Sequence, residues 1–307
     1  MIYTCTFNPA IDLVLPVPNL QLGDLNRVQN EAFVPGGKGI NMSVILRRLG
    51  LENTATGFLG GFTASFIEAA LVDEAITPHF IAADGITRIN VKLKGSVETE
   101  INASGPTIDA AKFQELVHYF ETNFQSGDTL FLAGTAAPGM GVEAYVTLAQ
   151  LCQKHEVKLV LDTTQTYLTA CLPYRPFIIK PNHIELAEIF GVTIETQAEL
   201  IAYGKQLQAQ GARNVLISQG SEGATLITET GDVYRSNIPK GKLVNSVGAG
   251  DSMLAGFMAE FLQTGDYAKA LQSGAATGSA TAYQVGLATK ADVEKLQAEI
   301  IITKIEE

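Results

Sequence analysis

The sequence predicts an α/β fold, in which a mostly parallel sheet carries helices on both faces and a small β-sheet is inserted into this core. Along most of the 307 residues, short apolar runs typical of buried strands alternate with segments whose apolar residues recur at helical spacing. Two stretches, 13–33 and 87–105, break this alternation, because they are β-biased and contain no helix of useful length. Strand–helix–strand units need crossover connections, which favour a parallel sheet covered on both faces.

The core elements follow in chain order. Residues 2–7 alternate as a strand, and 39–49 carries apolar residues at helical spacing before Gly50, a residue suited to end a helix. Residues 113–124 form an amphipathic helix. Short apolar runs separated by helical patterns then follow at 129–133, 158–161, 177–179 and 215–217. Ligands of such a sheet bind beyond the carboxyl ends of its strands.

The inserted β-sheet is expected to act as a lid. Residues 88–94 and 98–102 would pair as a hairpin around Gly95, and the alternative is a set of edge hairpins with no gating role. We therefore predict a single domain over residues 1–307. Its core would comprise about 1–12, 34–86 and 106–307, and its lid about 13–33 and 87–105.

The composition describes a globular protein and excludes several classes of function. Hydrophobic residues make up 46% and charged residues 17% of the chain. No apolar run reaches the ~18 residues of a membrane span, and the first residues lack the features of a signal peptide. We therefore expect no membrane partner. The three cysteines are widely spaced, which favours reduced thiols and a cytoplasmic protein. The net charge of −11 argues against a nucleic-acid partner, and four histidines without paired spacing argue against zinc.

The segment Val247–Gly248–Ala249–Gly250–Asp251–Ser252 precedes an apolar run that is typical of a buried helix. Its glycines let the backbone approach a ligand closely, and the first amides of the helix attract anions. Asp251 could accept a proton from a hydroxyl while neighbouring amides hold developing negative charge, as phosphorylation of a hydroxyl requires. The alternative is that Asp251 only caps the helix.

A second glycine-rich turn, Pro35–Gly36–Gly37–Lys38–Gly39–Ile40–Asn41, also opens a helix. Gly39 stands where a Walker A loop requires Ser or Thr, and neither turn contains the GxGxxG pattern of dinucleotide-binding proteins. The turn could contact sugar hydroxyls through its backbone, with Lys38 as a point charge for a phosphate. The alternative is a structural turn with a solvated lysine.

Two isolated residues are candidates for binding a sugar phosphate. Residues 8–12 are expected to end the first strand, where the Asp12 carboxylate could accept hydrogen bonds from two hydroxyls of a polyol; the alternative is an ordinary turn aspartate. Arg88 begins the inserted hairpin, where a guanidinium could bind a phosphate with two hydrogen bonds; the alternative is a surface charge.

Two further segments could bind a nucleotide and its metal. In Lys180–Pro181–Asn182–His183–Ile184–Glu185, Pro181 suits a helix start, and Asn182 and Glu185 share one helix face that suits a hydrated Mg²⁺. The alternative is a capping box in which Glu185 reaches back. The segment from Ser218 to Gly223 could leave amides and a hydroxyl free for phosphates, or it could be a plain turn.

In this order, the motifs resemble the ribokinase-like carbohydrate kinases, in their phosphosugar branch. The resemblance spans nearly the whole chain and is most specific at 36–41, 180–185 and 247–252. Segments 87–92, 99–102 and 239–246 are most similar to kinases of fructose 1-phosphate, and tagatose-6-phosphate kinases are the alternative. One departure is Thr135, which stands in Gly134–Gly139 where many relatives have a serine and two prolines.

The resemblance implies transfer of the γ-phosphoryl group of ATP, with Mg²⁺, to the 6-hydroxyl of fructose 1-phosphate. It assigns Asp251 as the base and the amides of Gly248, Ala249 and Gly250 as the anion hole. The sugar phosphate would be bound by Asp12, Gly36, Gly37, Lys38, Asn41, Arg88 and Asn90. ATP would be bound by Lys180, Asn182, Ser218, Gly220 and Gly223, and the metal by Glu185 through water. Relatives often pair their lids, which implies a homodimer. The rivals are a kinase of an uncharged sugar or nucleoside and a catalytically silent sensor.

Overall fold

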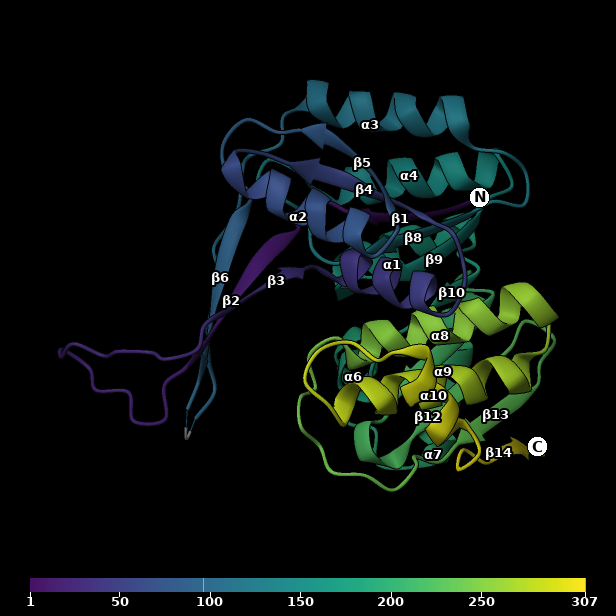
Figure 1. The fold of residues 1–307 in the computed structure, drawn as a ribbon. Coiled ribbons are helices and arrows are strands. Elements are labelled where there is room, and N and C mark those ends of the chain that lie inside the picture. Colours follow the sequence, from purple (N-terminus) through teal and green to yellow (C-terminus); the bar gives the residue numbers. More distant parts are fainter. Residues whose placement is uncertain (96, 307) are drawn as a thin grey trace.

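The computed structural model describes residues 1–95 and 97–306, and its strands form two separate sheets. The larger sheet has ten strands in the order β14-β13-β12-β11-β10-β9-β8-β1-β4-β5 (Figure 1). Its parallel part comprises β1 (Ile2–Thr6), β4 (Thr54–Leu59), β5 (Thr77–Ala82), β8 (Thr129–Ala133), β9 (Lys158–Asp162), β10 (Ile178–Ile179) and β11 (Asn214–Ser218). An antiparallel extension follows, formed by β12 (Ala224–Ile227), β13 (Val233–Ser236) and β14 (Ile302–Ile305).

Helices cover both faces of the larger sheet and bury two large apolar clusters against it. One face packs against α3 (Ala110–Asn123), α4 (Val142–Lys154), α5 (Gln165–Cys171), α6 (His183–Phe190) and α7 (Gln197–Ala209), with short 3₁₀ turns at Leu172–Tyr174 and Gly220–Glu222. The other face packs against α1 (Lys38–Arg48), α2 (Phe62–Asp73), α8 (Ala249–Thr264), α9 (Tyr267–Ala282) and α10 (Lys290–Gln297). The predicted three-layer α/β core with a mostly parallel sheet is therefore confirmed.

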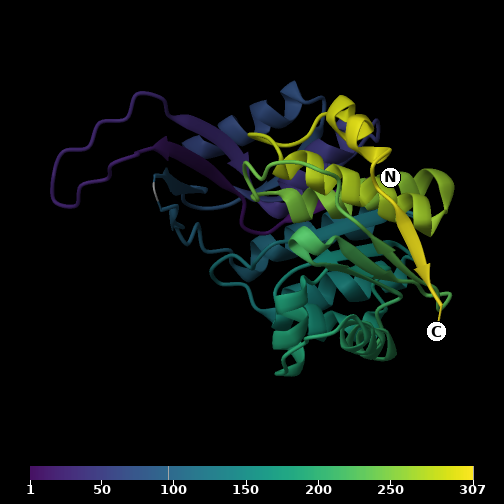
Figure 2. The same cartoon turned by 90° about the horizontal axis from the view of Figure 1, so that it is seen from below.

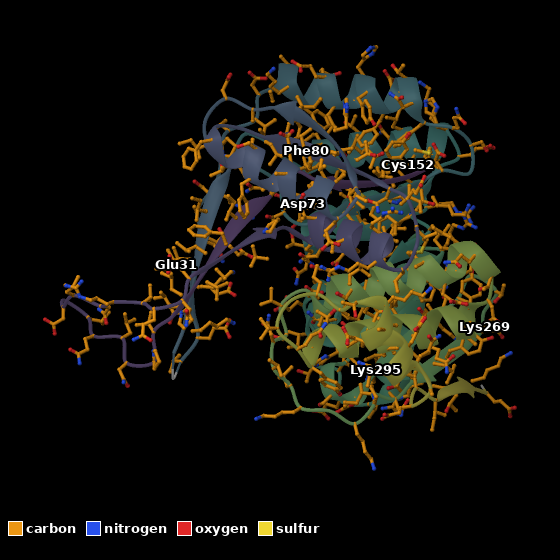
Figure 3. The ribbon with its side chains drawn as sticks, in the orientation of Figure 1. Glu31, Asp73, Phe80, Cys152, Lys269 and Lys295 are labelled. Atoms are coloured by element: carbon orange, nitrogen blue, oxygen red, sulfur yellow. The ribbon has the colours of Figure 1, made fainter. Side chains whose placement is uncertain are left out.

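The second sheet projects from one side of the core (Figure 1), and we keep the name lid for it. The small inserted sheet is thus confirmed, and its gating role stays a prediction. Its strands are β2 (Ala10–Pro16), β3 (Ala32–Gly36), β6 (Arg88–Lys94) and β7 (Thr99–Ile101), in the order β3-β2-β6-β7. The predicted hairpin is confirmed, because β6 pairs antiparallel with β7. The loop between β2 and β3 extends far from the core in both views (Figure 2), and it ends at Glu31, which is labelled in Figure 3.

The lid begins earlier in the chain than the sequence indicated. Asp12, predicted at the end of the first strand, lies inside β2 instead, because β1 ends at Thr6 and a new strand begins at Ala10. Pro9 stands between the two strands, and it lacks the amide that would continue the ladder of β1. The small sheet reaches Gly36 at its other end, so its strands extend about three residues into the predicted core on each side.

The two faces of the lid differ in chemistry. Paired residues share a face, and one face is apolar, formed by Ile11, Leu13, Leu15, Phe33, Ile89, Val91, Leu93 and Ile101. Near the core this face packs towards α2, because Ile11 and Ile89 join the cluster around Ile67 and the rings of Phe33 and Phe66 lie 6.5 Å apart. The opposite, polar face carries Asp12 and Asn90 and is directed away from α2. None of the helices in the described part of the chain has the length and apolar character needed to cross a membrane.

Candidate active site

Asp251 lies in the first turn of α8 and is only 7% exposed. Gly248 precedes this turn with a φ of 78°, a left-handed conformation that favours glycine. A Cβ atom on Gly248 would also come within 2.9 Å of Leu287 Cδ2. Asn41 Nδ2, from the first turns of α1, donates a hydrogen bond of 2.8 Å to Asp251 Oδ2. The two glycine-rich motifs, more than 200 residues apart, thus meet at one carboxylate.

The surroundings of Asp251 hold its pKa above the ordinary value of an aspartate. Burial is the largest cause, and the negative charge of Asp162 adds to it. The Lys38 ammonium and the hydrogen bond from Asn41 act in the opposite direction, but they do not outweigh burial. A carboxylate with a raised pKa is a stronger base, which suits proton abstraction from a hydroxyl.

Asp162 ends β9 beside Asp251, and the sequence interpretation missed it. Its side chain is 2% exposed and binds two ammonium groups: Lys38 Nζ lies 2.8 Å from Oδ1 and Lys180 Nζ lies 3.3 Å from Oδ2. Burial disfavours this charged carboxylate, but Lys180 and Lys38 outweigh it and lower the pKa of Asp162. The available signal was an acidic residue at the carboxyl end of an apolar strand, where α/β proteins bind ligands.

Asp162 holds both lysines in place and also affects the pKa of Lys38. Burial opposes the ammonium of Lys38, yet the Asp162 and Asp251 carboxylates together raise the pKa of Lys38. The Lys180 ammonium would lie 3.2 Å from a Cβ atom on Gly250, so this glycine leaves room for a cation at the beginning of α8. Lys38, predicted at the sugar phosphate, and Lys180, predicted at ATP, are therefore held on one carboxylate.

A cavity of about 550 Å³ lies next to the beginning of α8. The predicted residues Asn182, Ser218, Gly220, Gly223, Ala249 and Gly250 all line it. The sequence interpretation missed its apolar lining, which includes Ile238, Leu243, Met253, Ala275, Ala282 and Tyr283. The backbone of Gly241 passes against the ring of Tyr283, because a Cβ atom on Gly241 would come within 2.0 Å of Tyr283 Cε2. Tyr283 Oη also donates a hydrogen bond of 2.7 Å to Pro239 O. One side of the cavity is thus polar and rich in backbone amides, and the other is apolar.

The capping alternative for Asn182 and Glu185 is present in the structure. Asn182 Oδ1 accepts a hydrogen bond of 2.8 Å from the Glu185 amide, and Glu185 Oε2 accepts one of 2.8 Å from the Asn182 amide. Pro181 therefore precedes the helix, because Asn182 is its N-cap; the prediction that Pro181 starts the helix is wrong. Within residues 1–95 and 97–306, no group of three His, Cys, Asp or Glu side chains could enclose a metal. Any metal here would depend on ligands from water and substrate.

Asp12 and Asn90 meet on the polar face of the lid, beside the second glycine-rich turn. Asn90 Nδ2 donates to Asp12 Oδ1 at 2.9 Å, and a Cβ atom on Gly36 would lie 2.8 Å from Asp12 Oδ2. Gly37 has a φ of 121°, which side chains other than that of glycine rarely allow. The backbone of the turn therefore passes directly against the Asp12 carboxylate.

Arg88 lies at the base of the lid, where it joins separate segments of the chain. Its Nη1 donates to Ala103 O at 3.1 Å and its Nη2 to Asn8 O at 2.9 Å. Burial lowers the pKa of Arg88, against the favourable charge of Asp12. Arg88 Nε, Asn8 Oδ1 and Thr6 Oγ1 are buried polar atoms of this region without a hydrogen-bond partner. Two of the guanidinium nitrogens thus anchor the lid, and Nε is buried without a hydrogen-bond partner. Thr135 lies exposed in the loop after β8.

Comparison with known proteins agrees with this geometry. Residues 3–294 of this chain match the sequence pattern of the pfkB family carbohydrate kinases. A 1-phosphofructokinase of Bacillus subtilis is 42% identical over 305 residues, covering 99% of this chain and 100% of that protein. A D-tagatose-1-phosphate kinase of Bacillus licheniformis is 39% identical over 306 residues, covering 99% and 100%. The tetrameric inhibited form of phosphofructokinase-2 from Escherichia coli superposes with a TM-score of 0.90 at 25% identity, covering 97% of this chain and 98% of that one.

The family match covers the motifs, and the superposition covers the core and the lid. Both glycine-rich turns, the strand ends that carry Asp162 and Lys180, and the cavity beside α8 lie within the matched residues. The resemblance inferred from the motifs is confirmed. The chain belongs to the pfkB family of carbohydrate kinases.

Proposed function

We propose that this kinase transfers the γ-phosphoryl group of ATP to the 6-hydroxyl of fructose 1-phosphate and releases fructose 1,6-bisphosphate and ADP. One observation carries the proposal: a buried carboxylate, Asp251, follows two residues that line the cavity beside α8, accepts a hydrogen bond from Asn41 of the second glycine-rich turn, and has a raised pKa. The 42% identical relative that is named 1-phosphofructokinase supports this choice of sugar.

Asp251 is the base in this proposal. The 6-hydroxyl oxygen attacks the γ-phosphorus, the bond from that phosphorus to the β–γ bridging oxygen breaks, and the hydroxyl proton passes to the Asp251 carboxylate. The amides at the beginning of α8 would hold the charge of the transferred group. The Ala249 amide donates to Ser246 O at 3.2 Å, so we assign this work chiefly to the amides of Gly248 and Gly250.

Lys38 and Lys180 would compensate the repulsion between two anionic substrates. Phosphoryl transfer depends mainly on alignment and on neutralising charge. Lys38 forms an ion pair with Asp162, and the carboxylates of Asp162 and Asp251 both raise the pKa of Lys38. Its ammonium therefore stays protonated beside the base. We therefore extend the predicted role of Lys38 from the sugar phosphate to the transferred phosphoryl group. Lys180 would act on the ATP side, next to Gly250.

The nucleotide and its metal are assigned to the cavity beside α8. Its volume of about 550 Å³ and its apolar wall suit a planar base, and Asn182, Ser218, Gly220 and Gly223 would approach the phosphates. Mg²⁺ keeps several waters and takes ligands from phosphates, which fits a site beside which the Glu185 carboxylate already accepts a hydrogen bond from the backbone of Asn182. Glu185 would act on the ion through water. The ion would supply additional positive charge at the phosphates.

The sugar is assigned to the gap between the lid and the two glycine-rich turns. Asp12, supported by Asn90, would accept hydrogen bonds from ring hydroxyls, and Gly36, Gly37 and Asn41 would contact the sugar from the turn. Arg88 would contribute the remaining N–H groups of its two Nη atoms to the 1-phosphate from the base of the lid. The division into a core and a lid, predicted from the sequence, is part of this proposal, because closure would exclude water from the reaction.

We further propose that the lid mediates a homodimer and that the protein is cytoplasmic. α2 covers the apolar face of the lid only in part, and Phe33 and Ile101 are more than half exposed. An exposed apolar sheet face of this kind favours a second copy of itself in a symmetric pair. All three cysteines are buried as free thiols, which suits a reducing compartment.

The second candidate substrate is a tagatose phosphate. The relative named D-tagatose-1-phosphate kinase supports the 1-phosphate over the predicted alternative, the 6-phosphate. The test offers the purified protein and MgATP the 1-phosphates and 6-phosphates of fructose and tagatose, and measures ADP release and the position of the new phosphate by NMR. The proposal expects the highest kcat/KM with fructose 1-phosphate. A higher kcat/KM with another of these sugars would overturn it.

A further inference from the structure

Lys92 is a lysine on the polar face of the lid to which no role has been given so far. Residues two apart on a strand share a face. Lys92 therefore follows Arg88 and Asn90 along β6, on the same face of the lid as Asp12 of β2. Asn90 binds Asp12, and Lys92 lies one step further from the core, about 6.7 Å along the strand. Its side chain is only 11% exposed.

A buried ammonium must be paired, and Lys92 is paired by a displaceable partner. Lys92 Nζ lies 2.7 Å from Glu100 Oε2 and 3.3 Å from Asn102 Oδ1. Glu100 stands opposite Lys92 on β7, and its side chain is 39% exposed. Glu100 can therefore turn into solvent, whereas Lys92 cannot leave the lid without losing its burial. The charge that replaces Glu100 must itself be negative.

Arg88 differs from Lys92 in how much of it is free to bind a ligand. Two N–H groups of Arg88 already donate to the carbonyls of Asn8 and Ala103, and Nε is buried, so a phosphate would have to share the guanidinium with the base of the lid. Lys92 gives up only one carboxylate and can place its ammonium on a phosphate oxygen. In the proposed binding mode, Asp12 binds the ring hydroxyls of the sugar and the reacting hydroxyl lies at Asp251. The opposite end of the sugar, which carries the phosphate, would then extend along the lid.

We propose that Lys92 binds the phosphate already present on the sugar, and that Glu100 occupies Lys92 until a phosphosugar displaces it. This inference rests on the proposed function, because it requires a phosphorylated sugar as acceptor. A neutral sugar offers no charge to exchange for Glu100, so the pair selects sugar phosphates over free sugars. Lys92 is thus a specificity-determining residue of the lid.

The test compares substitutions at Lys92 and Glu100 in the full-length enzyme. Lys92→Gln should raise the KM for fructose 1-phosphate about 10- to 100-fold, the loss expected for one charge-assisted hydrogen bond. The ratio of kcat/KM for fructose 1-phosphate over fructose should fall by a similar factor, and Lys92→Arg should restore most of it. Glu100→Gln, which removes the competing charge, should lower the KM for fructose 1-phosphate. Binding of fructose 1-phosphate without ATP, measured by calorimetry, should follow the same order.

Lys94→Gln is the matched control. Lys94 lies on the same strand and face and is paired with Glu98, but it is one step further from the core and its side chain is 33% exposed. The KM values of the Lys94→Gln variant for fructose 1-phosphate and fructose should match those of the wild type. The inference is overturned if Lys92→Gln lowers activity on fructose and fructose 1-phosphate equally, or if Glu100→Gln raises the KM as Lys92→Gln does. Either result would mean that the pair only joins β6 to β7.

The proposed function can fail separately. Wild-type turnover of the four phosphosugars is measured first, and a preference for another sugar phosphate overturns the choice of fructose 1-phosphate alone. The same variants are then assayed with the preferred phosphosugar and its unphosphorylated parent. Loss of discrimination in Lys92→Gln would still support the role of Lys92, and unchanged discrimination would overturn it.

Discussion

Asn41 Nδ2 and Asp251 Oδ2 lie 2.8 Å apart and join the beginnings of α1 and α8. The hydrogen bond stabilises the charged form of Asp251 and so lowers its pKa, against burial, which raises it. The two helices contribute complementary groups to one contact: the amide of Asn41 donates and the carboxylate of Asp251 accepts. Their contact makes the pH dependence of the reaction sensitive to both.

Removal of the base should abolish most of the activity without disturbing the fold. Asp251→Asn keeps the shape of the side chain and loses the proton acceptor, so kcat should fall by about 10²–10⁴-fold. The variant should still bind ATP, which can be measured by calorimetry, and should melt at a temperature similar to that of the wild type. A near-normal kcat would reduce Asp251 to a structural residue of α8.

Asn41→Ala should move the acidic limb of the pH profile to higher pH. The base is active when deprotonated, so kcat/KM falls as the pH drops through the pKa of Asp251. Without the Asn41 hydrogen bond that pKa rises further, and the fall begins at a higher pH. The measurement is kcat/KM for the phosphosugar across the stable pH range. A limb that stays in place would show that Asn41 does not tune the base.

Asp162→Asn should move the same limb in the opposite direction. The charge of Asp162 raises the pKa of Asp251, so its loss, which also leaves Lys38 and Lys180 uncompensated, should lower that pKa. An upward shift would contradict the arrangement of charges described above. Comparison with Asn41→Ala provides the internal control, because any general loss of activity changes both variants but does not separate their limbs.

The same substitution should destabilise the protein. Removing one partner of a buried ion pair typically costs about 3–5 kcal/mol, and Asp162 is buried with the nearly buried Lys180. The pKa of Asp162 is lowered in the folded state, so its contribution is present above the unfolded value of about 3.9 and is lost as the pH falls through the folded pKa. Urea unfolding at neutral pH should therefore show the full difference. Equal unfolding free energies would contradict it.

Glu185→Gln separates the capping role from the metal role. A glutamine at this position still completes a capping box, so α6 should keep its stability. If Glu185 acts on Mg²⁺ through water, the loss of charge should raise the Mg²⁺ concentration that half-maximal activity requires. Glu199→Gln is the matched control, because Glu199 forms the equivalent capping box at the start of α7. Identical Mg²⁺ titrations for both variants would restrict Glu185 to capping.

A charge on the apolar face of the lid should disrupt the dimer. Ile101→Asp puts a carboxylate at an exposed position of β7, and it should shift the sedimentation coefficient towards that of a monomer. Val72→Asp provides the control on α2, because both side chains belong to residues that are 58% exposed. If the wild type sediments as a monomer, or if both variants remain dimeric, the lid is not the dimer interface.

Most of the core could be predicted from the sequence, because buried strands and amphipathic helices have distinct apolar periods. The strands at 129–133 and 158–161 and the helix before Gly50 were predicted within one or two residues. The strand Thr54–Leu59 was not, since its threonines and glycine do not form an apolar run. The register of Asp12 was also predicted wrongly, because the short turn around Pro9 separates two strands that look continuous.

By itself, the sequence determined that this protein is a carbohydrate kinase with a glycine-bounded Asp251 and a lysine-bearing turn. These motifs are local, so the chemistry of each can be inferred from neighbouring residues. Only the tertiary structure decided that Asp162 holds Lys38 and Lys180, that Arg88 anchors the lid, and that Lys92 shares a face with Asp12. Those relationships depend on strands that are distant in the chain and adjacent in the sheets, and no local pattern records which strands pair.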